Sequence, residues 1–347
     1  MNISQKIIIL SLLLNIICAY SQNVQEVQKP TDMEFLDSVF AELLSKRDSG
    51  FYTGIDILEG GLKSATTDFE LHKITFNLAF LYTETKQYDK CIDMWSSANR
   101  QGICYNYRLG DNPHPPYLAS YTENARFLEF LQENDSLIKK ISKDSKAEYF
   151  LNLPSGYNKL QKYPLLIVMH GGTGNFYRTY ENWQSGVIKD KFITVYTQGR
   201  YYRDSFFRSY GNEGIDDIKE IYAQVRNNYS VDTSSVILAG QSAGGELSLN
   251  LINGHVQAKG LFLAFPVKPS DFDFSRAQKL NTSSERIYMV CGEQDKRFYP
   301  GQAELSNLLD SANVENKVIH YPELGHGFPA DFEHQLDLGL EFILNNN

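Results

Sequence analysis

The sequence contains little cysteine and little tryptophan, and it has fewer positively than negatively charged residues. Its 347 residues include 4 Cys and 2 Trp, and 33 Lys and Arg stand against 42 Asp and Glu, a net charge of −9. Four cysteines are too few for a disulfide scaffold of this length, and a net negative chain lacks the basic excess typical of nucleic-acid binding. No cluster of Cys and His has zinc-ligand spacing, so no metal site is expected.

Long apolar runs are also scarce, and the one that stands out lies at the N-terminus. Lys6 precedes a mostly apolar run over 7–17, and the small residues Ala19 and Ser21 follow it. Because a bilayer span takes about 20 apolar residues, the shorter run predicts a secretory signal peptide over residues 1–21 instead of a membrane helix. We therefore expect a secreted or periplasmic protein, with a lipoprotein anchor through Cys18 as the minority alternative.

Removal of that segment leaves three cysteines, Cys91, Cys104 and Cys291. An odd number of thiols means that at least one is unpaired in an oxidising compartment. Cys291 ends an apolar run and is expected to be a buried small hydrophobe. A bridge between Cys91 and Cys104 is left open by the sequence.

The remaining sequence has an ordinary globular composition, with 42% apolar residues, 22 Tyr and 21 Phe. Its length corresponds to about two domains. Residues 22–135 form an expected helical region, in which helical periodicity runs from 31 to about 133 and begins with a capping box at Thr31 and Glu34. Within them, 79–98 resembles one tetratricopeptide unit, and a generic helical hairpin is the alternative. We expect a small all-α domain and linker, with a surface for a protein partner.

The pattern changes near residue 136, where apolar runs of strand length begin to alternate with helical segments. Over residues 136–347 this alternation predicts an α/β domain with a doubly wound, mostly parallel, eight-stranded sheet. The first two strands are expected to form an antiparallel hairpin, and the later ones are apolar enough to be buried on both faces. The eight expected strands cover residues 136–141, 148–153, 165–169, 192–196, 236–239, 261–265, 287–290 and 318–321.

A G-x-S-x-G motif, Gly240 to Gly244, stands between an expected strand and an expected helix. In that strand–turn–helix setting the motif places its serine on a tight turn. The two glycines remove side chains that would clash in the turn, and the helix N-terminus directs free N–H groups toward the serine. Ser242 is therefore the candidate nucleophile.

A serine nucleophile needs a base and an acid that orients the base. Asp295 and His326 follow Ser242 in the chain order typical of this motif, Ser then acid then His. All three lie just beyond expected strand ends, where open α/β sheets place their sites. We expect them to form the catalytic triad. Three other acids are weaker candidates for the orienting position: Glu293, Asp271 and Asp273.

The oxyanion of an acyl-transfer intermediate needs two backbone N–H donors. Ala243, directly after the serine, is one candidate. The loop that reads HGGTG from His170 offers the other, with Gly172 preferred over Gly171. His170 itself is interpreted as a packing and hydrogen-bonding residue. A phosphate-binding loop is the competing interpretation, but GxGxxG spacing and a following lysine are both missing.

Taken in order, the oxyanion loop, the serine, the acid and the histidine resemble the α/β-hydrolase superfamily over residues 136–347. The segments 153–157, 163–172 and 215–218 are similar to recurring segments of its esterases of the dienelactone-hydrolase, feruloyl-esterase and polyhydroxybutyrate-depolymerase type. The resemblance implies hydrolysis of carboxylic esters, small or linked to carbohydrate or another polymer, through a serine acyl-enzyme without a cofactor. The helical region lies outside the resemblance.

Two loops bear on the substrate. Residues 267–285 are too few for the helical lid that many relatives insert there, so we expect an open cleft. The loop 198–211 is rich in aromatic and cationic side chains and follows an expected strand near the mouth of the site. It is interpreted either as a substrate wall or as an ordinary packing loop. Its candidate substrate contacts are Tyr201, Tyr202, Arg203, Phe206 and Phe207.

Two other functions fit parts of the sequence. A serine peptidase of the prolyl-oligopeptidase type keeps the fold, although its relatives usually carry a large β-propeller. A non-catalytic binding module would use the helical domain, although a decayed hydrolase usually loses an element of its site. The leading hypothesis is an exported serine esterase.

Overall fold

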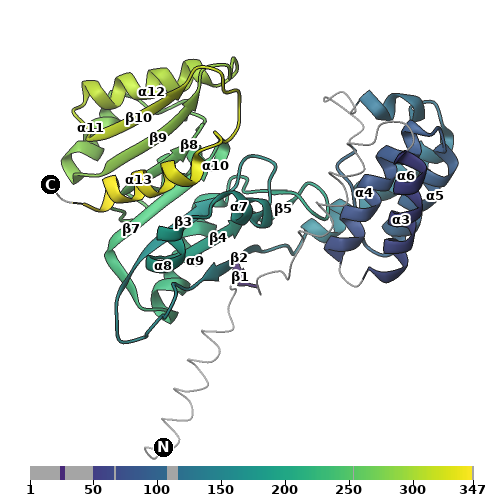
Figure 1. The fold of residues 1–347 in the computed structure, drawn as a ribbon, viewed down its shortest axis with the longest axis horizontal. Coiled ribbons are helices and arrows are strands. Elements are labelled where there is room, and N and C mark those ends of the chain that lie inside the picture. The colour runs from purple at the N-terminus through teal and green to yellow at the C-terminus, as the bar shows by residue number, and fades with distance from the viewer. Residues whose placement is uncertain (1–23, 28–49, 66–67, 108–115, 253, 346–347) are drawn as a thin grey trace, which may run out of the picture.

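The computed structural model describes residues 24–27, 50–65, 68–107, 116–252 and 254–345. An α/β body and a helical body stand side by side in it (Figure 1). The expected signal peptide and capping box lie outside the described residues. Among the helices that the structure describes, none is long and apolar enough to span a membrane.

The α/β body is built on one eight-stranded sheet, in the order β1-β2-β4-β3-β7-β8-β9-β10. Neighbouring strands run parallel except β2 and β4, which are antiparallel. This confirms the doubly wound, mostly parallel sheet that the sequence predicts. The strands are β1 (Val24–Glu26), β2 (Ala147–Asn152), β3 (Tyr163–Met169), β4 (Ile193–Gln198), β7 (Val231–Gln241), β8 (Gly260–Ala264), β9 (Arg286–Gly292) and β10 (Asn316–Tyr321).

Helices cover both faces of the sheet, because side chains alternate between the faces along each strand. In β3, Leu165 and Ile167 pack into one core, whereas Leu166 and Val168 pack into the other. The first core takes helices α9 (Gly214–Asn228), α10 (Ala243–Ile252), α11 (Phe274–Ser283) and α12 (Tyr299–Ser311). The second takes α7 (Phe176–Asn182), α8 (Gly186–Lys191) and α13 (Phe332–Leu344).

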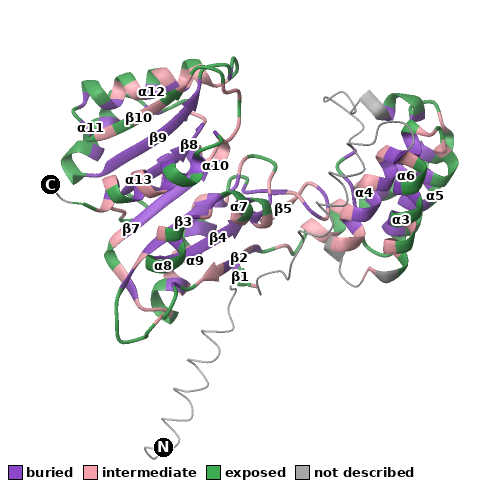
Figure 2. Cartoon of the chain, viewed as in Figure 1, coloured by how far each residue is buried: buried purple, intermediate pink, exposed green. Residues whose placement is uncertain are grey.

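The helical body packs around a cluster of aromatic rings. The Trp95 indole stacks on Phe130, with ring centroids 5.5 Å apart, and also contacts Tyr121 and Phe127. Figure 2 shows the buried faces of these helices turned toward one another. The body consists of α3 (Gly50–Ser64), α4 (Asp68–Glu84), α5 (Tyr88–Arg100), the 3₁₀ helix η1 (Pro116–Tyr121) and α6 (Ala125–Ser142). The tetratricopeptide-like interpretation of α4 and α5 stays a prediction.

The expected strand at 136–141 is wrong, because these residues form the end of α6. Leu137, Ile138 and Ile141 are partly buried at helical spacing and continue the stripe of α6 that begins at Phe127. The expected hairpin is wrong for the same reason: β2 pairs with β1 in parallel and with β4 in antiparallel orientation. Helix α6 therefore runs through the domain boundary expected at residue 135.

The three cysteines beyond the N-terminal segment, Cys91, Cys104 and Cys291, are free and buried. The bridge between Cys91 and Cys104 that the sequence leaves open is not formed. Burial raises the pKa of each thiol to about 12, so all three stay protonated at neutral pH.

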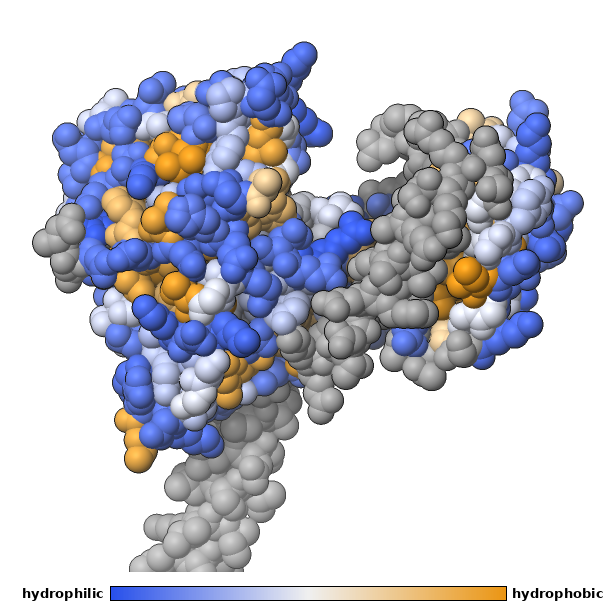
Figure 3. All heavy atoms as spheres, viewed as in Figure 1, coloured by the Kyte–Doolittle hydropathy of each residue, from blue (hydrophilic) through white to orange (hydrophobic). Residues whose placement is uncertain are grey.

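Among the residues that the structure describes, the exposed apolar side chains are spread over several elements. Large ones occur on α3 (Tyr52 and Ile57), on α4 (Phe76) and on α11 (Phe274). The face drawn in Figure 3 shows separate hydrophobic patches among hydrophilic residues on both bodies. Scattered exposure of this kind is normal for a protein surface and does not by itself mark a binding site.

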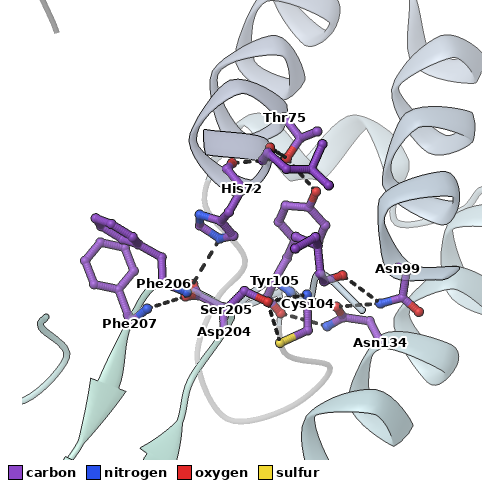
Figure 4. Close-up of polar contacts among 12 residues, drawn as sticks. His72, Thr75, Asn99, Cys104, Tyr105, Asn134, Asp204, Ser205, Phe206 and Phe207 are labelled. Carbon is purple, nitrogen blue, oxygen red and sulfur yellow. Dashed lines mark hydrogen bonds and ion pairs between the residues drawn. The ribbon is translucent and has the colours of Figure 1, made fainter. Parts of the chain in front are cut away.

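The two bodies meet at a hairpin formed by β5 (Tyr201–Tyr202) and β6 (Arg208–Ser209). The Cys104 N–H donates to Ser205 Oγ at 2.8 Å, and the Ser205 N–H donates to the Cys104 carbonyl at 3.0 Å. The His72 ring stacks on Phe206, with centroids 5.6 Å apart, and its Nε2 lies 3.8 Å from Asp204 Oδ1 (Figure 4). These contacts fix the tip of the hairpin against α4 and the segment after α5.

Asp204 gives this junction a pH-dependent stability. Its Oδ1 accepts the backbone N–H groups of Phe206 at 2.8 Å and Phe207 at 2.5 Å. Burial raises the pKa of Asp204 to about 6 and lowers the pKa of His72 to about 3. Above pH 6 the native state holds a buried carboxylate at Asp204. As the pH falls from about 6 toward 4, Asp204 takes up a proton in the native state but not in the unfolded state. The contribution of Asp204 to the free energy of unfolding therefore rises over this range. His72 lowers the free energy of unfolding as the pH falls, because its imidazole is protonated at a higher pH in the unfolded state than in the native state.

We expect Asp204→Asn to stabilise the protein at pH 7.5 by on the order of 2 kcal/mol, because the substitution removes a buried charge while the amide oxygen keeps the hydrogen bonds from the Phe206 and Phe207 N–H groups. The third backbone hydrogen bond, from Asn106, offsets part of the gain because it favours the carboxylate. The variant should also lose stability more steeply than the wild type as the pH falls from 6 to 4.5, since only the His72 effect remains. Urea unfolding at pH 7.5, 6 and 4.5 measures both differences. Parallel stability curves for the two proteins would contradict the assignment.

Candidate active site

Ser242 lies on a sharp turn between β7 and α10. Its φ is +52°, a left-handed conformation that is uncommon for residues other than glycine. Its N–H donates to the Ala264 carbonyl at 3.0 Å, and its own carbonyl accepts the Val267 N–H at 3.0 Å. The backbone strain of the turn is therefore held by the neighbouring strand β8 and the loop that follows it.

The two glycines of the motif are required by close backbone approach. A Cβ on Gly240 would lie 2.3 Å from the Gly244 carbonyl carbon, and a Cβ on Gly244 would lie 2.3 Å from the Met169 carbonyl oxygen. No flexible side chain can give way at either position, because both obstacles are backbone. The motif glycines thus let α10 begin directly against the end of β3.

The structure brings Ser242, His326 and Asp295 into one hydrogen-bonded chain. His326 Nε2 lies 2.9 Å from Ser242 Oγ, and His326 Nδ1 lies 2.5 Å from Asp295 Oδ2. With the Nδ1 proton donated to the carboxylate, Nε2 is left to accept the serine hydroxyl proton. Asp295 is buried, with 4% of its side chain exposed, whereas His326 is 34% exposed and open to a substrate.

The Asp295 carboxylate has further donors from α12 and the turn before it. The Phe298 N–H donates to Oδ1 at 3.2 Å, and Gln302 Nε2 lies 3.5 Å from Oδ2. Two aromatic rings flank the imidazole: the Phe265 and Phe298 centroids lie 4.9 and 5.0 Å from that of His326. No sequence motif marks Phe265, Phe298 or Gln302, because the fold alone brings them to the site.

The expected oxyanion loop lies beside the serine turn. A Cβ on Gly171 would lie 3.6 Å from Ser242 Cβ, and one on Gly172 would lie 3.6 Å from Ala243 Cβ. Ala243 is the first residue of α10, where an N–H has no acceptor within its own helix. The loop and the helix N-terminus thus place two backbone segments next to the serine.

His170 supports this loop as a neutral residue. Its Nε2 accepts the Gly199 N–H at 3.2 Å, which leaves the proton on Nδ1, 2.5 Å from the Gly171 carbonyl. Burial lowers the pKa of His170 to about 4, and its ring stacks on Tyr210 with centroids 4.3 Å apart. His170 therefore packs and bonds within the protein instead of acting as a second base.

The three rival acids have other partners. Glu293 is exposed at the end of β9, Asp271 pairs with Arg276 at 2.6 Å, and Asp273 caps α11. The segment 267–285, which the sequence predicts to be too short for a lid, contains the short helix α11. Arg276 Nη2 donates to the Leu249 carbonyl at 3.1 Å and so connects α11 to the end of α10.

The five expected substrate contacts belong to the β5–β6 hairpin. The Tyr201 hydroxyl donates to Glu213, the Tyr202 ring lies under the Arg208 guanidinium at 4.0 Å, and Arg203 Nε donates to Ser209 Oγ at 3.1 Å. Phe206 stacks on His72, and the Phe207 ring lies edge-on to Phe206 with centroids 4.6 Å apart. These contacts pack the hairpin between the two bodies, and the role of the five side chains as substrate contacts stays a prediction.

No group of three or more His, Cys, Asp or Glu side chains arranged to hold a metal ion occurs in the described part of the chain. The donors at the site are a hydroxyl, an imidazole, a carboxylate and backbone N–H groups. Together they can perform nucleophilic acyl transfer, which needs a base, an orienting acid and oxyanion donors.

The chain is similar in sequence and fold to several known proteins. Residues 199–337 match the dienelactone hydrolase family. A structure of an uncharacterized protein from Bacillus cereus is similar at 21% identity and a TM-score of 0.50, over 91% of this chain and 99% of that chain. Two structures of the esterase Est2 from Thermogutta terrifontis are each 14% identical to this chain and cover 58% of it. The propionate-bound structure matches over 90% of its own chain with a TM-score of 0.43. The native structure matches over 88% of its own chain with a TM-score of 0.44. No curated protein matches the chain.

The sheet-containing body has the fold that the resemblance to the α/β-hydrolase superfamily implies, and the family match over residues 199–337 supports a hydrolase. The order of the eight strands, the serine turn after β7 and the match over residues 199–337 all fall within this body. Residues 199–337, which lie within the α/β body, are thus similar to the dienelactone hydrolase family.

Proposed function

We propose that the protein is a serine esterase that hydrolyses carboxylic esters through Ser242, His326 and Asp295. The observation that carries the proposal is the continuous hydrogen-bonded chain from the serine hydroxyl through the imidazole to a buried carboxylate, at 2.9 and 2.5 Å. The family match over residues 199–337 supports the same class of reaction.

In the proposed reaction, Ser242 Oγ attacks the ester carbonyl carbon while His326 Nε2 takes its proton. Asp295 stabilises the resulting imidazolium through Nδ1–H, and the N–H groups of Gly172 and Ala243 hold the oxyanion. Collapse of the intermediate breaks the bond to the alcohol, which leaves with the proton from His326. Water then attacks the acyl-enzyme by the same route and releases the acid. No cofactor takes part.

The site is proposed to be open to solvent and the protein to be exported. The partly exposed His326 and the short α11 segment support an open site for bulky or polymer-linked esters. Export follows from the N-terminal apolar run and the small residues after it.

The test is a substrate panel combined with active-site labelling. We expect turnover of p-nitrophenyl acetate and butyrate, and labelling by one equivalent of a fluorophosphonate on the peptide that contains Ser242. A succinyl-Ala-Pro p-nitroanilide should be cleaved with a kcat/KM at least 100-fold lower. Folded protein that turns over no ester, or that is labelled at another residue, would rule the proposal out; faster peptide cleavage would favour the peptidase.

A further inference from the structure

A cavity of about 430 Å³ lies where the helical body meets the α/β body. Gly102 and Ile141 contribute one wall from the helical side, and Phe176 and Tyr177 at the start of α7 contribute another. The β5–β6 hairpin supplies most of the remaining wall, together with Glu148 of β2 and Gln198 of β4. Sites for small molecules typically measure roughly 300–1,000 Å³, so the cavity has the size of a ligand site.

The cavity is lined in part from the edge of the sheet that carries the candidate active site. Gln198, which lines it, is the last residue of β4, and Gln241, directly before Ser242, is the last residue of β7. Only β3 lies between these two strands. Because neighbouring strands are about 4.8 Å apart, the ends of β4 and β7 are separated by about 10 Å. A substrate longer than its ester group can therefore reach both places.

The charges on the cavity wall cancel. Arg208 Nη2 lies 3.0 Å from Glu148 Oε1, and the two side chains are only 8% and 23% exposed. The other lining residues are uncharged, and burial raises the pKa of both Tyr177 and Tyr202, which keeps their hydroxyls protonated. A net-neutral wall favours a neutral ligand over an anion or a cation.

Side chains on the cavity wall can both donate and accept further hydrogen bonds. Gln198 Oε1 accepts the Phe176 N–H at 2.9 Å, which leaves the amide nitrogen as a donor. The Tyr202 hydroxyl accepts from Arg208 Nη2 at 2.8 Å and keeps its own proton, while the second oxygen of Glu148 remains an acceptor. Phe176, Tyr177, Tyr202 and Phe206 add aromatic rings.

Aromatic rings next to mixed donors and acceptors match one chemical class. The C–H faces of a sugar ring pack on aromatic rings, and its hydroxyl groups both donate and accept hydrogen bonds. A fatty chain would leave the polar groups of the wall unpaired, at a cost in binding. We propose that this cavity is a sugar-binding subsite, and that the helical body serves to complete its wall.

The assignment of this sugar to the alcohol side of the substrate rests on the proposed esterase function, whereas sugar binding itself does not. The walls are held in place before any ligand arrives, because Ser205 and Phe206 are fixed by Cys104 and His72 (Figure 4). Preorganised walls reduce the entropy lost on binding. An ester carried by an oligosaccharide would place the acyl group at Ser242 and a neighbouring sugar in the cavity.

Calorimetric titration of the full-length protein with xylotetraose, cellotetraose and maltotetraose tests sugar binding directly. We expect saturable binding of at least one of the three. Ile141→Trp, which fills the cavity from the helical side, should weaken that binding at least tenfold, and Tyr202→Phe should weaken it severalfold. Leu128→Trp, on the exposed face of the same helix, is the matched control and should leave it unchanged.

Hydrolysis of p-nitrophenyl acetate, measured on the same proteins, separates the two proposals. We expect Leu128→Trp to keep the wild-type rate within about twofold, and Ile141→Trp to lower kcat/KM for an acetylated xylotetraose at least tenfold more than it lowers kcat/KM for p-nitrophenyl acetate. Ester turnover without binding of any tetrasaccharide would overturn the sugar subsite and leave the esterase standing. If the wild type bound a sugar but turned over no ester, and Ile141→Trp abolished the sugar binding, the subsite would stand and the esterase proposal would be overturned. Equal sugar binding by Ile141→Trp and Leu128→Trp would place the sugar elsewhere.

Discussion

Ser242→Ala is expected to lower kcat for p-nitrophenyl acetate by about 10⁵-fold or more, because the acyl-enzyme can no longer form. Alanine keeps the Cβ of serine, so the strained backbone of the turn, with its φ of +52°, should be retained. Steady-state kinetics and fluorophosphonate labelling measure the loss, and urea unfolding shows that the variant is folded.

A second serine on α10 provides a matched control. Ser248 is fully buried and donates to the Gly244 carbonyl at 2.9 Å, so Ser248→Ala removes a hydroxyl from the same helix without touching His326. We expect at most a severalfold change in kcat. If Ser242→Ala kept the wild-type rate, or if both variants lost activity equally, the assignment of the nucleophile would be wrong.

The second large effect is expected at the acid. Asp295→Asn should lower kcat by about 10⁴-fold, because an amide nitrogen facing His326 Nδ1 favours the tautomer that cannot take the serine proton. The change preserves volume, and its oxygen can still accept the Phe298 N–H that Asp295 Oδ1 accepts at 3.2 Å. Loss of kcat with little change in KM and in unfolding free energy would show that orientation of the base is what is lost.

Glu293→Gln is the matched control for that experiment. Glu293 stands two residues before Asp295 and is exposed, so the variant should retain the wild-type rate within about twofold. The reverse outcome, an inactive Glu293→Gln beside an active Asp295→Asn, would assign the acid to Glu293. Loss of activity in both variants would point to the whole loop after β9.

The sequence predicts which three residues form the hydrogen-bonded chain of the candidate site more accurately than it predicts the edges of the fold. Ser242, Asp295 and His326 each follow an apolar strand, and a parallel sheet brings such strand ends to one edge. Strand β1 is only three residues long, too short to carry a periodic pattern. The stretch 136–141 is a short apolar run, for which helix and strand periods are hard to distinguish.

Contacts between distant segments explain the rest of what the sequence does not predict. The hairpin contact joins Cys104 to Ser205, 101 residues apart, and the Phe265 ring reaches His326 from another strand end. Such pairs leave no local pattern, since each residue alone is an ordinary buried polar or aromatic side chain. The aromatic loop 198–211 is therefore identified by its composition, whereas its place between two bodies requires the fold.

The position of the helical body in the chain limits how the protein can be shortened. Strand β1 precedes that body and β2 follows it, yet the two pair directly, with Val24 opposite Ala147. A protein cut to begin at residue 136 would lose β1 and leave β2 as an uncovered edge, whose free N–H and C=O groups invite pairing with a second copy. An internal deletion that joins Val27 to Ala147 through a linker would remove the helices and keep the edge protected. The helical body thus behaves as an insertion into the α/β body, and excising it as a loop is the route to a monomeric core.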